Sequence, residues 1–517
     1  MNDIIDGLAA AIAGNGARLA FGVTGSGPSW SLITRLEELG VHYLPTCHEA
    51  AAALMAGAAA RTTGVVTPSI SIKGPGLANM LPGIIANGYE NAPALSISEA
   101  YGSDAPASRM HKRLDHSAVL RSVVKQHIGA GHLDRDLSTL FCTAQAEIPG
   151  PVHVDLADTA APPALPPSLP VAPSAVDVQR VLDAIVSAAR PAVIAGSLAL
   201  RRAWRTQLAT LRVPVFTTAA GKGAIPEDLP AAAGIFTGDG RDLAPETAVL
   251  ASADLIVGIG LRNAEILSLQ FQGTPLVIVD EVDAYVAGIE PEARLVGADA
   301  QCIASVLDAV AEHSWGIDLI ARAGSRLVET LSRAGWLPAR CFHHVDRLED
   351  PHALVLDTGS FCTVGEHVWT ARAGRTFLGS SNGRFMGVSV PSAIGLALAR
   401  PGLPVVCVAG DGGMVAYAPE LRLALAERLP LCIVYMTDGR YGSIAAAMPA
   451  GSRSERAITL PGRAWWRTVE TWGWNAQPVA AEPEFVAALE AWDRSTPLFL
   501  EAAFDPARYA AMTQDLR

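Results

Sequence analysis

Short apolar runs alternate with helix-like segments along nearly the whole chain, and this alternation limits the possible folds more than any other feature. In the first 160 residues, strand-like runs such as LAFGVTG and VVTPSISI each lead into a glycine-containing turn and then a helical pattern. Strand–helix–strand alternation with short apolar strands builds parallel sheets that are covered by helices on both faces. The sequence therefore predicts an α/β protein made of doubly wound parallel sheets.

A change of composition divides this pattern. The stretch from Thr159 to Ala175 is rich in proline and carries no charge, which predicts an extended and fairly stiff linker. A second α/β pattern follows and closes around Ala334, and a third begins near Cys341. We expect three units at residues 1–165, 176–335 and 340–517, of which the first and third could share one architecture. The length of 517 residues agrees with about 100–200 residues per domain.

Charge and composition exclude several classes of protein. The formal net charge is −12, which argues against a basic surface for nucleic acid or an anionic membrane. The apolar runs are strand-length, well short of the roughly 20 residues of a membrane helix. The seven cysteines form no CxxC pair, and the acidic start lacks the basic region of a signal peptide. We expect a cytoplasmic protein with neither a nucleic-acid nor a membrane partner.

The stretch from Pro404 to Gly442 contains the most specific motif. Gly410-Asp411-Gly412 follows an apolar strand, and 24 residues separate it from Thr437-Asp438, which follows the next strand. A helical crossover between them makes the two strands parallel, so both carboxylates should emerge at the same edge of the sheet. Two carboxylates beside glycines that admit a diphosphate suit Mg²⁺. The alternative is two unrelated turns, because Asp-Gly is common in turns.

This pattern is similar to the thiamine-diphosphate signature of the acetolactate synthase and pyruvate decarboxylase superfamily, which reads Gly-Asp-Gly, about two dozen residues, then Asn-Asn. The resemblance implies a pyrimidine domain, a central domain and a diphosphate domain in that order. It also implies that Mg²⁺ is held by Asp411, the side chain of Asp438 and the backbone carbonyl of Arg440. The chain reads Thr437-Asp438 where the family usually has Asn-Asn. Aspartate is an equally hard ligand, but its extra charge bears on cofactor affinity.

The same resemblance assigns residues to the cofactor. Met386 matches the family's wedge beneath the bent cofactor, and the carbonyl of Arg384 would meet its amino group, although the family usually has glycine there. A core methionine is the alternative for Met386, and ordinary turn chemistry is the alternative for the segment 358–360. The full set of expected cofactor contacts is Glu49, Gly76, Asn79, Thr358, Gly359, Ser360, Arg384, Met386, Gly410, Gly412, Gly413, Tyr441 and Gly442.

Glu49 is the predicted catalytic carboxyl group. Thiamine chemistry needs a carboxyl beside the pyrimidine N1′, and a buried glutamate at a strand-to-helix junction can supply it. His48-Glu49-Ala50-Ala51 stands at such a junction and resembles the family's His-Glu-x-Ala context. A first-turn residue that complements the helix dipole is the alternative. In the family this glutamate faces a cofactor on the partner subunit, so the resemblance implies a homodimer or a dimer of dimers.

Four further residues are predicted to surround the reacting carbon. Ser26, in the turn GVTGSGP, and Lys73, before Gly-Pro-Gly, resemble family positions near the thiazolium; His111 and Lys112 lie in a loop that resembles a substrate-contacting region. Lysine is costly to desolvate unless an anion meets it. We therefore expect Lys73 to favour a substrate with a second anionic group. The alternative is that Lys73 faces solvent or pairs with a nearby acidic side chain.

The resemblance implies an enzyme that acts on a 2-oxo acid. The first expectation is a decarboxylase that works through an enamine intermediate. An acetolactate-synthase-like carboligase is the alternative enzyme, and an inactive cofactor-binding regulatory subunit is an alternative of a different class. Arg262-Asn263-Ala264-Glu265-Ile266 replaces the stretch that acetolactate synthases associate with FAD, which argues against FAD. A nicotinamide or flavin dehydrogenase is disfavoured because no strand is followed by GxGxxG.

Overall fold

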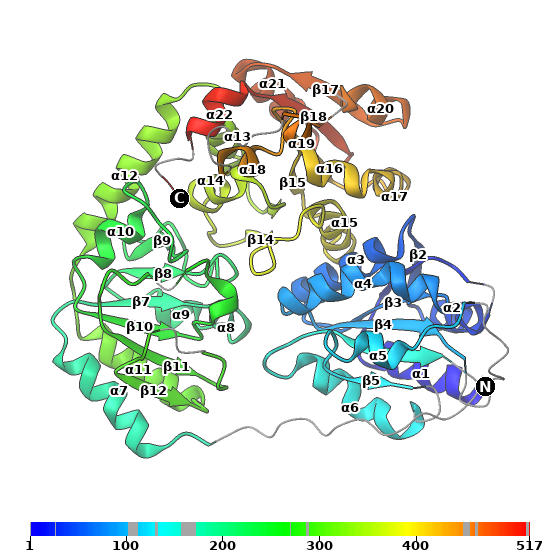
Figure 1. Cartoon of the computed structure of the whole chain (residues 1–517), viewed down its shortest axis with the longest axis horizontal. Coiled ribbons are helices and arrows are strands. Elements are labelled where there is room, and N and C mark those ends of the chain that lie inside the picture. The colour runs from blue at the N-terminus through cyan, green and yellow to red at the C-terminus, as the bar shows by residue number, and fades with distance from the viewer. Residues whose placement is uncertain are drawn as a thin grey trace.

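The structure is a computed structural model that describes residues 2–25, 27–101, 112–129, 133–156, 172–268, 270–285, 289–447, 455–460, 464–512 and 516. Within these residues lie three six-stranded sheets in which every strand pair is parallel. Figure 1 shows the three sheets in separate units, blue to cyan, green, and yellow to red. The prediction of three doubly wound α/β units is confirmed.

The N-terminal unit has the strand order β2-β1-β3-β4-β6-β5. Its strands are β1 (Leu19–Gly22), β2 (His42–Pro45), β3 (Thr67–Ser71), β4 (Ala94–Glu99), β5 (His127–Ile128) and β6 (Val152–Leu156). Its helices are α1 (Asn2–Gly14), α2 (Pro28–Glu38), α3 (Glu49–Thr63), α4 (Pro75–Tyr89), α5 (His116–Leu120) and α6 (Leu133–Gln145). The predicted linker lies mostly outside the described residues.

The C-terminal unit has the order β14-β13-β15-β16-β18-β17, which is the connectivity of the N-terminal unit. Its strands are β13 (Ala353–Leu356), β14 (Thr376–Gly379), β15 (Val405–Gly410), β16 (Leu431–Thr437), β17 (Asn475–Val479) and β18 (Leu498–Ala503). Its helices are α13 (Pro338–Asp346), α14 (Ser360–Val368), α15 (Ser389–Ala399), α16 (Asp411–Ala416), η2 (Ala418–Glu420), α17 (Leu421–Ala426), α18 (Gly442–Ala447), α19 (Glu455–Ile458), α20 (Trp465–Thr471), α21 (Glu482–Ala491) and α22 (Pro506–Met512). The first and third units therefore share one architecture.

The central unit has a different order, β12-β11-β10-β7-β8-β9, which reverses direction between β10 and β7. Its strands are β7 (Pro191–Ala195), β8 (Val215–Thr217), β9 (Ala232–Ile235), β10 (Leu255–Ile259), β11 (Leu276–Asp280) and β12 (Ala293–Val296). Its helices are α7 (Ala175–Ser187), α8 (Ser197–Arg201), α9 (Arg205–Leu208), α10 (Pro245–Leu250), η1 (Asn263–Glu265), α11 (Ala300–Ala311) and α12 (Ile317–Arg333).

Helix α3 of the N-terminal unit packs against the C-terminal unit. Its alanine-rich sequence is buried almost throughout, and it packs against α15 in a shared apolar cluster that includes Met55 and Ile394. A Cβ at Gly395 of α15 would lie 2.4 Å from the carbonyl oxygen of Met55, so the two helices approach too closely for any larger residue. Small side chains in α3 and α15 therefore set the distance between the two units (Figure 1).

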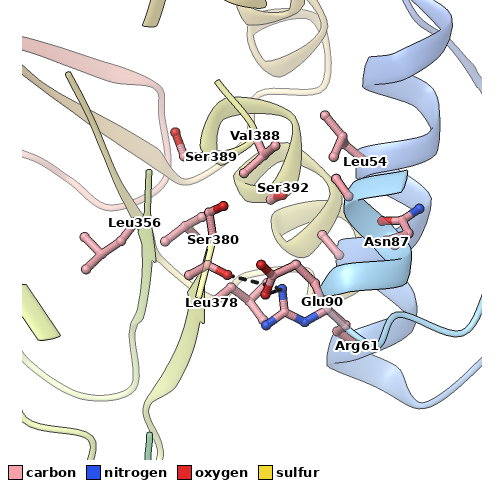
Figure 2. A pocket seen from close by; sticks show the side chains of 15 residues that line it. Leu54, Arg61, Asn87, Glu90, Leu356, Leu378, Ser380, Val388, Ser389 and Ser392 are labelled. Atoms are coloured by element: carbon pink, nitrogen blue, oxygen red, sulfur yellow. Dashed lines mark hydrogen bonds and ion pairs between the residues drawn. The ribbon is translucent and has the colours of Figure 1, made fainter. Parts of the chain in front are cut away.

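A small cavity of about 20 Å³, the size of one water, lies on this contact between the units (Figure 2). Figure 2 shows Arg61 of α3 pointing toward Glu90, and the two charged groups lie 3.6 Å apart. Glu90 also accepts hydrogen bonds from the backbone of Asn382 and Gly383. The buried ion pair therefore fixes the segment that leads to Met386. No helix within the described ranges is both long and apolar enough to cross a membrane.

Candidate active site

Two aspartates meet at the carboxyl edge of the C-terminal sheet, as the motif predicts. Asp411 follows β15 and Asp438 follows β16, and each is 8% exposed. One oxygen of Asp411 accepts hydrogen bonds from the hydroxyls of Tyr435 and Thr437. The other accepts from the backbone amides of Asp438 and Gly439 at 3.0 and 3.2 Å. Burial and the neighbouring Asp411 carboxylate raise the pKa of Asp438 to about 6.

Glycines beside these aspartates allow neighbouring groups to pack closely against the backbone. A Cβ at Gly412 would lie 2.4 Å from the sulfur of Met386, and a Cβ at Gly413 would lie 2.3 Å from a carboxylate oxygen of Asp357. Asp357 is fully buried and accepts hydrogen bonds from the backbone of Gly387 and the hydroxyl of Ser389. Its burial raises its pKa to about 6. The structure thus brings Gly412 and Gly413 together with Met386.

Hydroxyl groups at the starts of α14 and α18 lie near the aspartate pair. The hydroxyl of Ser360, in the first turn of α14, lies 2.9 Å from that of Ser443 at the start of α18. A Cβ at Gly442 would lie 3.3 Å from Asp438 and 3.6 Å from Ser360.

The amide of Arg440 donates to Asp438 at 3.1 Å, and the amide of Tyr441 donates to the carbonyl oxygen of Ile458. Thr358 and Gly359 precede α14 directly, with the Thr358 amide bonded to the Asp357 carboxylate.

Met386 and Arg384 lie beside the same edge. Met386 is 49% exposed, so it is not the core methionine of the alternative interpretation. Arg384 has a φ of 48°, in the left-handed region that favours glycine. This backbone conformation explains why glycine is usual at the position. The Arg384 guanidinium turns away to pair with Glu366 at 2.8 Å.

Glu49 begins α3 at the carboxyl edge of the N-terminal sheet and is 8% exposed. Its carboxylate accepts a hydrogen bond from Asn79 of α4 at 3.2 Å, so two predicted site residues meet. The preceding amides of Cys47 and His48 both donate to Glu420, which reaches across from the C-terminal unit. Burial raises the pKa of Glu420 to about 7. Glu420 therefore positions the start of the helix that carries Glu49.

Lys73 pairs with an acidic side chain, which was the alternative to its binding an anionic group of the substrate. Its ammonium lies 2.9 Å from the carboxylate of Glu99, which ends β4 and has a side chain only 3% exposed. Glu99 also accepts hydrogen bonds from the backbone of Gly27 and from the backbone and hydroxyl of Ser29. The desolvation cost that motivated an anionic substrate is thus offset by Glu99.

The other predicted substrate residues are described in part. Ser26 and His111 lie outside the described residues. Lys112 is exposed and has a φ of 58°. A Cβ at Gly74 would lie 2.3 Å from the carbonyl oxygen of Lys112, so the backbone of Lys112 lies against the Gly74-Pro75-Gly76 turn. Gly76 itself is buried in the first turn of α4, where a Cβ would lie 2.9 Å from Ile72.

Family models match all three units. The thiamine pyrophosphate enzyme N-terminal TPP binding domain matches residues 3–119, the central domain 178–303, and the C-terminal TPP binding domain 357–502. The chain belongs to the thiamine-pyrophosphate-dependent enzymes. Its cofactor is therefore thiamine diphosphate, and it is a 2-oxo acid decarboxylase or carboligase.

Curated relatives of this thiamine enzyme include proteins named as acetolactate synthases and one named as a decarboxylase. The chain is 26% identical to a catabolic acetolactate synthase from Raoultella terrigena, covering 83% of this chain and 82% of the relative. It is 26% identical to a probable 2-ketoarginine decarboxylase from Pseudomonas aeruginosa, covering 84% and 81%. An acetolactate synthase from Bacillus subtilis is 25% identical, covering 83% and 80%.

In this thiamine enzyme, the crevice of the central sheet is filled by the chain's own side chains. Glu265 accepts hydrogen bonds from the backbone and hydroxyl of Ser197 at the start of α8, and from the hydroxyl of Thr218 at 2.8 Å. Arg262 binds Asp280 through two hydrogen bonds of 2.9 and 3.0 Å. These residues occupy the point where the strand order reverses, where such sheets place nucleotides.

Sequence reasoning missed Glu99, Asp357 and Glu420. Each is a buried carboxylate that accepts backbone amides from a neighbouring segment. None has a motif of its own, because the partners are distant in the sequence. The one available signal was position: Glu99 and Asp357 both stand at the carboxyl end of a predicted strand.

Proposed function

We propose that this chain is a thiamine diphosphate- and Mg²⁺-dependent 2-oxo acid decarboxylase of the cytoplasm. The observation that carries the proposal is the buried pair of Asp411 and Asp438. Within the described residues, no Lys, Arg or His side chain forms an ion pair with either carboxylate. Two buried carboxylates that lie together without a counter-ion are unfavourable, and a bound divalent cation removes that cost.

The residues present fit the cofactor. Asp411, Asp438 and the carbonyl of Arg440 are hard oxygen ligands for Mg²⁺, and Gly412 and Gly413 have no side chain that would keep a diphosphate away from the backbone. The hydroxyl of Ser360 and the amides that begin α14 can donate to that diphosphate. When bound, the cofactor supplies a thiazolium that stabilises the negative charge left on the substrate carbon by loss of CO₂.

Glu49 is the residue we assign to proton movement. A buried carboxyl can share a proton with the pyrimidine N1′ only if its position is held, and Asn79 and Glu420 hold it. The side chain is also shielded from bulk water, which favours a proton shared with the cofactor over one shared with solvent.

We also propose a homodimer in which each site combines Glu49 of one chain with Asp411 of the other. Within one chain, Phe385 beside Met386 contacts Tyr89 at the end of α4. Asn79, which binds Glu49, lies ten residues earlier on α4, about 15 Å away at 1.5 Å per residue. Met386 therefore lies near the C-terminal end of α4 and Glu49 near its N-terminal end, which supports a site that is completed by a second chain.

Mixed dimers test this arrangement. Glu49→Gln and Asp411→Ala chains, each inactive alone, are co-expressed with different tags and purified through both tags. A site shared between subunits leaves one intact site in the mixed dimer, so activity returns. If the mixed dimer is as inactive as both parents, each chain contains its own complete site.

The reaction is tested by incubating the holoenzyme with a panel of 2-oxo acids and identifying products by mass spectrometry. Release of CO₂ and the corresponding aldehyde supports decarboxylation. A 2-hydroxy-ketone or acetohydroxy acid as the main product favours the carboligase alternative, in keeping with the acetolactate synthases among the relatives. No turnover of any 2-oxo acid by cofactor-loaded protein contradicts the proposal and favours a regulatory subunit.

A further inference from the structure

Three histidines converge on one aspartate in the N-terminal unit, outside the residues assigned to the cofactor. His116 begins α5, His127 lies on β5, and His153 and Asp155 lie on β6. The Asp155 carboxylate is 2.6 Å from Nδ1 of His116, 2.6 Å from Nε2 of His127 and 3.2 Å from Nε2 of His153. We call these four residues the histidine cluster.

Strand geometry holds the histidine cluster together. His153 and Asp155 are two residues apart on β6, so their side chains lie on the same face of the sheet. His127 is the direct partner of His153 across the β5–β6 pair. His153, His116 and Asp155 are 0%, 5% and 7% exposed. The cluster is therefore a rigid and nearly dry site.

The hydroxyl of Ser96 determines where the hydrogen of His153 lies. Ser96 Oγ donates its single hydrogen to the carbonyl oxygen of Val152 at 3.1 Å. The same oxygen lies 2.8 Å from Nδ1 of His153. When the hydroxyl hydrogen is used in this way, Nδ1 carries a hydrogen and donates it to Ser96.

With its hydrogen on Nδ1, a neutral His153 has a bare Nε2 that faces the carboxylate oxygen of Asp155. Two acceptors at 3.2 Å repel each other unless a positive charge lies between them. A cation shared by Nε2 and the carboxylate resolves the contact.

We propose that the histidine cluster binds one divalent transition-metal ion, with Zn²⁺ the best match. The ligands are Nδ1 of His116, Nε2 of His127, Nε2 of His153 and a carboxylate oxygen of Asp155. Three imidazoles and one carboxylate make a four-coordinate set typical of zinc, whereas Mg²⁺ and Ca²⁺ prefer oxygen ligands. Each histidine would coordinate the metal through the named nitrogen and carry its hydrogen on the other ring nitrogen.

The distances suit a site that closes around a metal. The ligand atoms of His116, His153 and Asp155 all lie within 4.8 Å of one another. Zinc bonds of about 2.0–2.1 Å bring tetrahedral ligands to roughly 3.3 Å apart, so small shifts suffice for these three atoms, whereas Nε2 of His127, which is outside this group, must move further to become the fourth ligand. Ser96 accepts from the far nitrogen of His153, which is the outer contact that orients metal-bound histidines. The metal would tie α5 to β5 and β6, and with them the turn from Lys112 to Asp115.

Metal content tests the proposal. The full chain, kept with thiamine diphosphate and Mg²⁺, is treated with a chelator and dialysed, then titrated with Zn²⁺ against a chromophoric chelator. We expect one tight zinc site per chain, a higher melting temperature in the zinc-loaded protein, and the visible absorption of tetrahedral Co²⁺ when cobalt replaces zinc. The Asp411→Ala variant should retain this site, which distinguishes it from the Mg²⁺ position.

Three variants locate the ion. His127→Gln removes the most accessible ligand and should abolish tight zinc binding. Ser96→Ala keeps all four ligands, removes the outer contact, and should weaken zinc affinity by about 10- to 100-fold. His313→Gln, outside the cluster, should bind zinc as the wild type does. Circular dichroism checks that each variant is folded, and Ser96→Ala decides the question if His127→Gln is not.

Two results would overturn the proposal. One is wild-type protein that takes up no stoichiometric zinc or cobalt and melts at the same temperature with and without them. The other is zinc affinity that is unchanged in both His127→Gln and Ser96→Ala. Either result makes the cluster a hydrogen-bonded network around Asp155, in which the Ser96 hydroxyl donates to Nδ1 of His153 and its Nε2 donates to Asp155.

Discussion

The C-terminal unit and the central unit differ in whether the acidic side chains at the carboxyl ends of their strands are paired with cations. At the edge of the C-terminal sheet, Asp411 and Asp438 are buried, and no cationic side chain in the described part of the chain pairs with them. At the same edge of the central sheet, Asp280 is paired with Arg262. Glu265 there is enclosed by hydrogen-bond donors of the chain itself.

The comparison shows that sheet architecture alone does not decide where a cofactor binds. All three sheets are parallel and place side chains at a carboxyl edge. The proposed ligand site lies where buried charges lack a partner among the described residues, as at Asp411 and Asp438. The central unit pairs Arg262 with Asp280 and encloses Glu265 with its own hydrogen-bond donors.

The largest effect should come from Glu49→Gln. The substitution keeps the shape but removes the ionisable carboxyl, so cofactor binding should survive while proton exchange at carbon 2 slows by about 10²- to 10⁴-fold. Exchange is followed by NMR on the cofactor-loaded protein. Glu37→Gln, on the exposed face of α2, is the control. An unchanged exchange rate would show that Glu49 is not the group.

Asp411→Ala should come next. Loss of a direct metal ligand should weaken Mg²⁺-dependent binding of thiamine diphosphate by more than the 10- to 100-fold that loss of an outer contact costs. Titration calorimetry with and without Mg²⁺ measures the effect, and Glu490→Ala on α21 is the control. Wild-type binding that is equally tight without any divalent metal would contradict the proposed role of the aspartate pair.

Glu265→Gln tests the central unit. The amide cannot accept all the hydrogen bonds that the carboxylate accepts, so the free energy of unfolding should fall by about 1.5–3 kcal/mol. Cofactor affinity should not change. Urea unfolding measures the first and calorimetry the second, with Glu312→Gln at the end of α11 as the control. A loss of cofactor affinity without a loss of stability would mean that the central crevice serves the cofactor after all.

The smallest effect should come from Lys73→Met. Because Glu99 already pairs with Lys73, we expect kcat/KM to fall by similar factors for a monoacidic and a diacidic 2-oxo acid. The two factors should differ by less than the roughly tenfold that one hydrogen bond to a charged group contributes. Steady-state kinetics on matched substrates gives the ratio. A loss above tenfold on the diacid alone would restore the hypothesis that Lys73 binds a second anionic group of the substrate.

The sequence by itself predicted the fold class, which the structure confirms, and it predicted that Asp411 and Glu49 lie at the carboxyl edges of two sheets. Buried strands such as β15 and β16 are continuous apolar runs, and Gly410-Asp411-Gly412 and Glu49 stand directly after strands, where topology requires them to reach an edge. The strands that sequence reasoning did not find are β5, β9, β12 and β17. Each is at the edge of its sheet, where one side is unpaired and the apolar pattern is weaker.

Only the tertiary structure decided which charges are paired. Lys73 and Glu99 are 26 residues apart and Glu420 reaches Cys47 across 373 residues, so no local pattern connects them. The histidine cluster likewise unites α5, β5 and β6 through strand register. Sequence periodicity specifies which face of an element is buried. Which buried charge finds a partner depends on contacts between distant segments, and these form only when the units pack together.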